Sequence, residues 1–138
     1  MGDGDCNIGG DGGPAAAGKV RNPRGIAVVG SDVHIGDTGN CRVRKIAGGA
    51  ITTTLGTGWC HYGGDGASAT NAAMSNPGEV AVDSSGNLYI ADTGNCRIRR
   101  VTPGGVISTF AGNGACAYAG DGGLAVNASL NGPRGVAV

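Results

Sequence analysis

Short runs that contain Val, Ile, Leu or Ala, two of them also rich in Arg, alternate with glycine-rich and polar segments along the whole chain. Each run spans four to six residues, a length typical of β-strands and too short for most helices. One group of runs lies at residues 25–29, 33–36, 42–46 and 50–55, a second at 79–82, 88–91, 97–101 and 106–111, and a single run at 135–138. The pattern therefore predicts two sets of four short strands, followed by one more strand.

The first and last runs of each group differ in polarity. The first run is mostly apolar, which predicts a strand that is buried on both faces. The last run carries hydroxyl side chains such as Thr53 and Thr109, which predicts an outer and more polar strand. In the long connection after each group, Ala-rich stretches at 68–74 and 125–130 predict a single helical turn.

Three separate motifs repeat with nearly the same spacing. A proline precedes the first run of each group: 54 residues separate Pro23 from Pro77, and 56 separate Pro77 from Pro133. The segment Asp-Thr-Gly-Asn-Cys-Arg-Val-Arg-Lys-Ile at 37–46 matches residues 92–101 at seven of ten positions. Gly-Asp-Gly at 10–12 recurs at 64–66 and at 120–122, ahead of the same three prolines. A constant period in three motifs indicates tandem duplication of one structural unit.

Four antiparallel strands followed by a long crossover are the plan of a β-propeller blade. The chain is therefore predicted to be all-β, with two full four-stranded blades and an extra inner strand. It would form an incomplete propeller or part of a ring that other chains complete. The expected boundaries are a crossover at 1–24, a blade at 25–56, a crossover at 57–78, a blade at 79–112, and a crossover with the first strand of a third repeat at 113–138.

Composition narrows the classes of function. Ten Lys and Arg balance ten Asp and Glu, which argues against a dedicated nucleic-acid binder and against a polybasic membrane anchor. No apolar stretch approaches the roughly 18 residues of a membrane-spanning helix. The N-terminus lacks the basic start and apolar run of a signal peptide. Thirty glycines in 138 residues indicate many tight turns between short strands.

The repeat resembles the NHL family of β-propellers. The resemblance rests on Asn-x-Pro-x-Gly-Val-Ala-Val at the first strand and on Leu-Tyr-Ile-Ala-Asp-Thr-Gly-Asn-Cys-Arg-Ile-Arg-Arg-Val at 88–101. It also rests on Phe-Ala-Gly-Asn-Gly at 110–114, followed by Gly-Asp-Gly-Gly at 120–123. The second copy fits the NHL pattern best. The first copy departs from that pattern at residues 33–35 and in the turn before them, which is one residue shorter. The resemblance implies blades that close into a ring of about six.

Two blades alone leave apolar faces exposed, because a repeat unit cannot bury its own face. We therefore expect copies of the chain to associate with one another, or the chain to be part of a longer propeller. Three copies would supply six blades, and open-ended association would build fibres. Residues 4–28 and 113–138 are equivalent segments, so in a closed ring one would displace the other.

The five cysteines follow the same period. Cys41 and Cys96 precede the third strand of each blade, whereas Cys6, Cys60 and Cys116 lie in the crossovers. Both classes fall on one rim of an up-and-down blade, where they can form disulfides. Either Cys41–Cys60 forms with Cys96–Cys116, which closes the shorter loops, or Cys6–Cys41 forms with Cys60–Cys96; the sequence leaves both open. Disulfides would indicate an oxidising compartment, extracellular or periplasmic, whereas duplication alone would leave all five cysteines reduced.

The sequence predicts no catalytic, cofactor or metal site. His34 takes the strand position that Tyr89 takes in the second copy, and His61 lies in a crossover; neither has the spacing of a zinc ligand. Asp65 and its counterparts in the Gly-Asp-Gly turns are interpreted as turn caps, because Ca²⁺ needs six to eight oxygen ligands. An enzyme similar to the NHL-like lyases or lactonases would need catalytic residues in further blades.

The crossovers and the turns before the third strands form one rim, which is the predicted interaction surface. Its candidate residues are Trp59, Tyr62, Tyr118, Arg42 and Arg97. Trp59 resembles a partner anchor, although packing over the blade would also explain it. The arginines are expected to pair with acidic groups and rim carbonyls. The expected function is a non-enzymatic scaffold that binds a protein or ligand; RNA binding is disfavoured by the neutral charge and the few aromatic residues.

Overall fold

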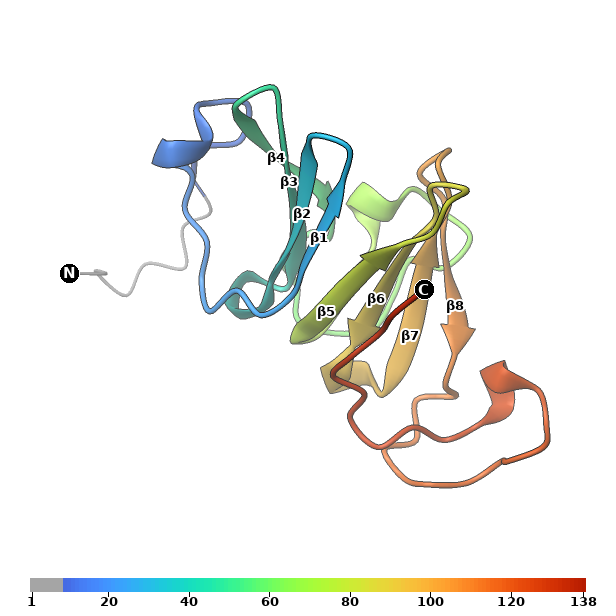
Figure 1. The fold of residues 1–138 in the computed structure, drawn as a ribbon. Coiled ribbons are helices and arrows are strands. Elements are labelled where there is room, and N and C mark those ends of the chain that lie inside the picture. The colour runs from blue at the N-terminus through green and yellow to red at the C-terminus, as the bar shows by residue number, and fades with distance from the viewer. Residues whose placement is uncertain (1–8) are drawn as a thin grey trace.

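The computed structural model describes residues 9–138, which form two four-stranded antiparallel sheets standing side by side (Figure 1). The first blade contains β1 (Ile26–Val29), β2 (Asp32–Asp37), β3 (Arg42–Ala47) and β4 (Ala50–Leu55). The second contains β5 (Pro77–Val82), β6 (Leu88–Asp92), β7 (Arg97–Val101) and β8 (Ile107–Ala111). The strands of each sheet lie in chain order, which confirms the all-β blade architecture.

Short 3₁₀ turns are the only helical elements of the described residues. Three of them lie in the crossovers: η1 (Ala15–Ala17), η3 (Ala69–Asn71) and η5 (Ala125–Asn127). Two more lie in the turns before the third strands: η2 (Thr38–Asn40) and η4 (Thr93–Asn95). η3 and η5 are shorter than the helical turns expected at 68–74 and 125–130, because the backbone on both sides of each is extended. None of these helices has the length and apolar character needed to cross a membrane.

The two blades pack on each other through one apolar core. Its buried side chains are Val43 and Leu55 from the first blade, Ala69, Ala72 and Met74 from the crossover, and Val80, Leu88, Ile90, Val101 and Ile107 from the second blade. The second crossover, residues 57–78, therefore fills the space between the sheets as well as connecting them. Each sheet buries a face only by stacking on its neighbour, as expected for a repeat architecture.

Two glycines allow the backbones of the blades to touch. A Cβ atom at Gly25 or Gly36 would overlap backbone atoms of Gly78 or Glu79 in the second blade. Neither glycine has a positive φ, so close approach and not turn geometry requires glycine at these positions. Any larger residue would push β1 and β2 away from β5.

The two innermost strands differ in burial, which corrects the expectation that both are buried on both faces. In β5, Val80 is buried in the core. In β1, Ala27 packs against that core, whereas Ile26 and Val28 are each 64% exposed. Alternate residues of a strand point to opposite faces, so Ile26 and Val28 face away from the second blade. No other segment of residues 9–138 covers that face of β1.

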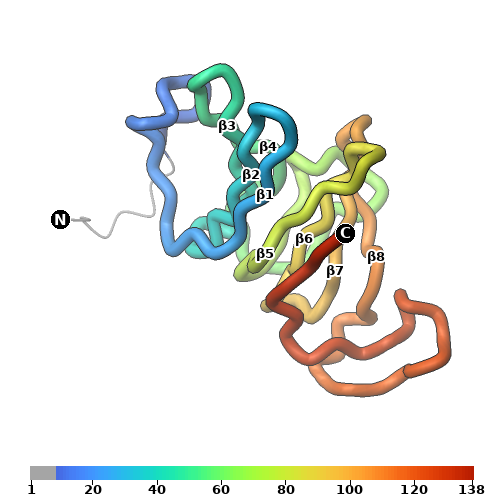
Figure 2. Tube along the Cα trace, viewed as in Figure 1, coloured from blue at the N-terminus to red at the C-terminus, as the bar shows by residue number. Residues whose placement is uncertain are grey.

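The strand expected at 135–138 is not formed. The end of the chain runs alongside β5 in Figures 1 and 2, and the Glu79 N–H donates to the Arg134 carbonyl at 3.0 Å. A strand requires a hydrogen-bonded ladder, and no neighbouring segment of the described chain supplies one here.

Each of the first two crossovers adds an extended edge to the outer strand of the blade that follows it. Ser68 forms an isolated antiparallel bridge with Val106 beside β8, and Pro14 forms one with Ala50 of β4. Backbone hydrogen bonds of 2.8–3.1 Å flank both bridges. The third crossover, residues 112–132, carries the equivalent segment, but no sheet of the described residues pairs with it in this way.

Candidate functional site

The rim begins with the tight turns that enter the third strands. The side-chain amide of Asn40 donates to both carboxylate oxygens of Asp37, at 3.0 and 2.9 Å, and the second blade repeats this pair. The turns end at Cys41 and Cys96, whose φ values of 51° and 52° are left-handed. Such a conformation is uncommon for a residue other than glycine, and here it directs each cysteine toward a crossover.

Two disulfides fasten these turns to the crossovers. Cys41 is bonded to Cys60, and Cys96 is bonded to Cys116. Of the two pairings that the sequence left open, the structure has the one that closes the shorter loops; Cys6 lies outside the described residues. Each disulfide ties a crossover to the blade that it leaves. The bridge between Ser68 and Val106 ties the second crossover to the blade that it enters.

Arg42 and Arg97 support the rim from within the third strands. The Nε of Arg42 donates to the Gly56 carbonyl at 3.1 Å, and its Nη2 donates to the Thr57 carbonyl. The Nη2 of Arg97 donates to the Asn113 carbonyl at 2.8 Å. These carbonyls belong to the first residues after the outer strands. Both guanidinium groups therefore hold the start of a crossover against its blade.

Trp59 projects from the loop that is fixed in this way. It is 72% exposed and borders a surface hollow of about 460 Å³ that Arg42, Asn40 and Cys60 also line. It is the only tryptophan of the chain, and the equivalent position of the next crossover is Ala115. An exposed aromatic side chain on a fixed loop, beside an arginine, has the properties of a protein-binding anchor.

Tyr62 and Tyr118 occupy equivalent positions in different surroundings. The Arg97 guanidinium lies 3.8 Å from the centroid of the Tyr62 ring, and the Tyr62 hydroxyl donates to Asp65 at 2.9 Å. Tyr118 is 81% exposed, and its hydroxyl bonds to Asp121 at 2.5 Å. Tyr62 therefore belongs to the packing of its crossover, whereas the ring of Tyr118 is open to contact.

A buried arginine lies beneath the rim in each blade. Arg99 is fully buried, with Nη1 3.2 Å from the Asp92 carboxylate and Nη2 2.5 Å from the Asp65 carboxylate. The equivalent residues of the first blade are Arg44, Asp37 and Asp11. Because Asp92 comes from the blade and Asp65 from the crossover, Arg99 joins the two segments.

Asp65 has a larger role than the turn cap that the sequence suggested. Besides Arg99, its carboxylate accepts hydrogen bonds from the Tyr62 hydroxyl and, at 2.6 Å, from the Thr109 hydroxyl. A signal for this role exists in the repeat. The aspartate of Gly-Asp-Gly lies 33 residues before the buried arginine in one copy and 34 in the next. Two aspartates and one arginine recur at nearly the same spacing in both copies, and this recurrence could have indicated an ion-pair cluster.

The two carboxyl groups around Arg99 have opposite pKa shifts. Burial acts to raise the pKa of Asp65, but the Thr109 hydrogen bond and the Arg99 charge outweigh it, so its pKa is below the usual value of 3.8. For Asp92, burial dominates over the hydrogen bonds of Asn95 and Ser75, and its pKa is raised.

The lowered pKa of Asp65 predicts a pH-dependent contribution to stability. A carboxylate whose folded-state pKa is lowered stabilises the fold above the unfolded-state pKa, and this is lost as the pH falls through the folded-state value. We expect Asp65→Asn to lower the free energy of unfolding at pH 7, and the difference from wild type to shrink below about pH 4. Denaturant unfolding of both proteins at pH 7, 5 and 3 measures this difference in free energy of unfolding.

Asp121→Asn is the matched control for this measurement, because Asp121 occupies the equivalent turn but is exposed. Its effect on monomer stability should stay within about 0.5 kcal/mol at each pH. If Asp65→Asn lowers the free energy of unfolding by the same amount at pH 7 and at pH 3, the prediction is contradicted.

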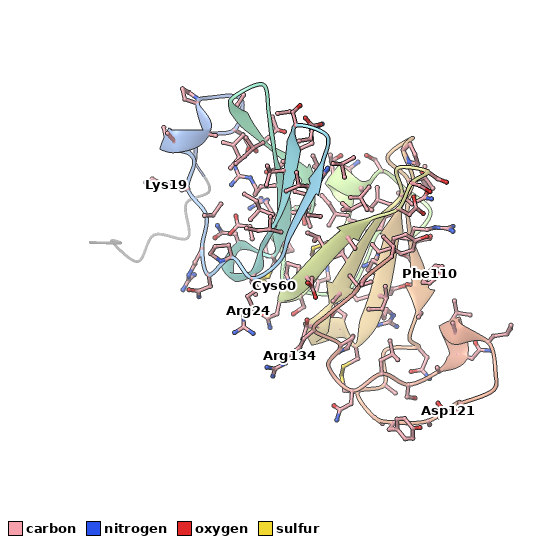
Figure 3. All side chains as sticks on the ribbon, in the orientation of Figure 1. Lys19, Arg24, Cys60, Phe110, Asp121 and Arg134 are labelled. Carbon is pink, nitrogen blue, oxygen red and sulfur yellow. A yellow bond between two sulfur atoms is a disulfide. The ribbon has the colours of Figure 1, made fainter. Side chains whose placement is uncertain are left out.

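A second hollow, of about 540 Å³, lies where the first strands of the repeats begin. Arg24, Arg134 and Glu79 are among its lining residues, and the two arginines extend from the same end of the blades in Figure 3. Two threonines also line it, but their hydroxyls already donate to the carbonyls of Pro77 and Pro133. No sequence motif indicates this hollow, because its residues come from three different repeats.

The histidines have ordinary surroundings. His34 lies in β2 opposite Lys45 of β3, and burial, with the charge of Lys45, lowers its pKa. His61 is exposed in the second crossover. Among residues 9–138, no three His, Cys, Asp or Glu side chains come close enough to hold a metal ion.

Comparison with known proteins agrees with this architecture. Residues 58–119 match the family of the teneurin NHL domain, so the NHL-type repeat is confirmed for the second blade and parts of the crossovers around it. A protein of unknown function from Bacteroides thetaiotaomicron superimposes with a TM-score of 0.68 at 25% identity, over 78% of this chain. A second protein of that bacterium gives a TM-score of 0.51 at 23% identity, over 64% of this chain and 22% of its own length.

A more distant likeness is to the virginiamycin B lyase of Staphylococcus aureus, with a TM-score of 0.46 at 21% identity over 64% of this chain and 26% of that protein. This chain spans 27% of the length of the first Bacteroides protein. The matched part of this chain therefore corresponds to about a quarter of the two Bacteroides proteins.

Proposed function

We propose that this NHL-type propeller segment is a non-enzymatic scaffold that binds a protein partner through its rim. The observation that carries the proposal is the exposure of Trp59 on a loop that the Cys41–Cys60 disulfide and Arg42 hold in place. Binding energy at protein interfaces concentrates on tryptophan, tyrosine and arginine side chains that are already ordered. Arg42 lines the hollow beside Trp59, and its hydrogen bonds to the Gly56 and Thr57 carbonyls already fix its position.

Two further properties belong to the proposal. The disulfides support an oxidising location, extracellular or periplasmic, because reducing compartments disfavour structural disulfides. The exposed apolar side chains of β1 support self-association, because an open blade face is a stacking surface. The chain would thus work as an assembled scaffold whose rim loops face the partner.

Selection from a random peptide library displayed on phage tests the rim. We expect peptides selected on the immobilised protein to lose at least about tenfold in affinity when Trp59 is replaced by alanine. Because Trp59 is the single tryptophan, its fluorescence should shift to shorter wavelength when such a peptide covers it.

Tyr118→Ala provides the control, since Tyr118 is at least as exposed as Trp59 but lies in the next crossover. It should leave the affinity of these peptides unchanged. If peptides bind Trp59→Ala as tightly as the wild type, or if the tryptophan emission does not change on binding, the Trp59 loop is not the binding surface.

A further inference from the structure

The two ends of the described structure present complementary unpaired surfaces. At one end, the first blade exposes Ile26 and Val28. At the other end, the third crossover exposes Leu124, 70% accessible, and Tyr118. Figures 1 and 2 place this third crossover, drawn in orange to red, at the opposite end of the molecule from β4. The junction between the two blades shows how such surfaces fit together.

At that junction, the second crossover is held on the second blade by three kinds of contact. Asp65 bonds to the buried Arg99, residues 66–69 pair with the edge of β8, and Met74 is buried between the sheets. The third crossover has a counterpart for each: Asp121, residues 122–125 and Leu130. Among the described residues, none of these makes the contact of its counterpart.

The receiving surface also exists on the first blade, where the N-terminal segment of the same chain covers it. Asp11 bonds to Arg44 at 2.5 Å and to the Thr53 hydroxyl at 2.8 Å, and Pro14 bridges Ala50. These contacts have the same geometry as those of Asp65 and Ser68 on the second blade. The N-terminal segment therefore occupies a site that a crossover from a preceding blade also fits.

We propose that copies of this chain assemble head to tail by segment exchange: residues 120–138 of one copy displace residues 10–28 of the next. Asp121 then bonds to Arg44 and Thr53 of the second copy, and Leu124 takes the place of Pro14 beside Ala50. Residues 132–138 replace residues 22–28, with which they share five of seven residues, as the innermost strand of the receiving blade. Stacking on the donor's second blade then covers the open face of the receiving blade.

Side-chain size and tethering favour the incoming segment. Leu130 stands at the position of the fully buried Met74, whereas the N-terminal segment has the shorter Val20 there, 40% exposed. Tyr118 stands at the position of Tyr62, which packs on Arg97 and, at 4.9 Å, on Arg99. The Cys96–Cys116 disulfide already fixes the base of the donor segment to its own blade. Less conformational entropy is therefore lost when the donor segment docks.

Two matched substitutions test the exchange, measured as the association constant from light scattering or sedimentation over a range of concentrations. Asp121→Asn removes a charge from the donor segment and should weaken association by about tenfold. Asp11→Asn removes the equivalent charge from the segment that must leave, and should strengthen association by a similar factor. The same chemical change thus has opposite effects at two equivalent positions.

A cross-link identifies the contact directly. Ser68 and Val106 are opposed in an antiparallel bridge, so Leu124→Cys and Ala50→Cys should form an intermolecular disulfide in a Cys6→Ser background. Peptide mass mapping would detect the linkage between 124 and 50, and Val126→Cys with Ala50→Cys provides the control that should link poorly.

A strictly monomeric wild type at all concentrations would overturn both the exchange and the proposed self-association. Assembly that persists unchanged in Asp121→Asn, without the 124–50 linkage, would overturn the exchange alone. Both results leave the Trp59 experiment to decide rim binding independently.

Discussion

Replacing Arg99 by methionine should lower the free energy of unfolding by about 3–5 kcal/mol at pH 7. Arg99 and Asp92 are both fully buried and lie 3.2 Å apart. Methionine fills much of the space of the arginine stem, but it leaves the Asp92 carboxylate in the protein interior without its cation. Burial of an uncompensated charge costs more than the loss of one hydrogen bond. The substitution also removes the ion pair between Arg99 and Asp65, so the crossover should loosen from the second blade.

Denaturant titration followed by far-ultraviolet circular dichroism measures the loss, and two variants identify its cause. Arg99→Met combined with Asp92→Asn should recover part of the stability, because it removes the unpaired buried charge. Arg24→Met, at an exposed arginine, should change stability by less than about 0.5 kcal/mol.

The pH dependence of the Arg99→Met variant gives a second check on the cause. Without the cation, the already raised pKa of Asp92 rises further, so the penalty is relieved as the pH falls below the folded-state value and the carboxyl group is protonated. A loss below about 1 kcal/mol at pH 7 would show that water or another group compensates Asp92.

Removing either disulfide should cost about 3 kcal/mol of stability. Cys41–Cys60 and Cys96–Cys116 close loops with sequence separations of 19 and 20, so their loss should increase the entropy of the unfolded chain by similar amounts. The paired serine substitutions Cys41→Ser with Cys60→Ser, and Cys96→Ser with Cys116→Ser, test each bond separately. The shift of each unfolding midpoint in urea, multiplied by a common m-value, gives the loss in free energy of unfolding.

The two disulfides should differ in their effect on the rim. Trp59 is adjacent to Cys60, so loss of the first disulfide should raise the mobility of the indole, seen as lower fluorescence anisotropy, and should weaken rim-bound peptides. Loss of the second should leave the Trp59 signal unchanged, because its loop carries Ala115 instead. If reducing the wild-type protein leaves its unfolding midpoint unchanged, the cross-links contribute no stability.

Much of the fold follows from local patterns that the sequence displays. The run at 97–101 could be assigned to a strand because its apolar residues are bounded by a turn signal and a proline-glycine turn. Strands β6 and β7 lie within one residue of their expected limits. Repetition strengthened each assignment, because the same pattern appeared again about 55 residues later. Cys41 and Cys96 could be placed on the rim for the same reason.

The candidate site could be predicted only in part. Trp59 was singled out because it is a tryptophan in a crossover on the predicted rim, and its role as an anchor stays a prediction. The link from Asp65 to Arg99 was missed, because the two residues are 34 positions apart and belong to different segments of the repeat. Local rules for aspartate in a glycine-rich turn favour a cap, and nothing local opposes that interpretation.

The sequence alone determined the blade plan, the period, the order of strands and the class of each cysteine, because these depend on residues close together in the chain. Only the tertiary structure decided which cysteines pair and that Ile26 and Val28 are exposed while Val80 is buried. It also decided that residues 135–138 form no strand. Burial and pairing depend on what lies on the other side of a segment, and equivalent repeat sequences have different neighbours at the middle and at the ends of the stack.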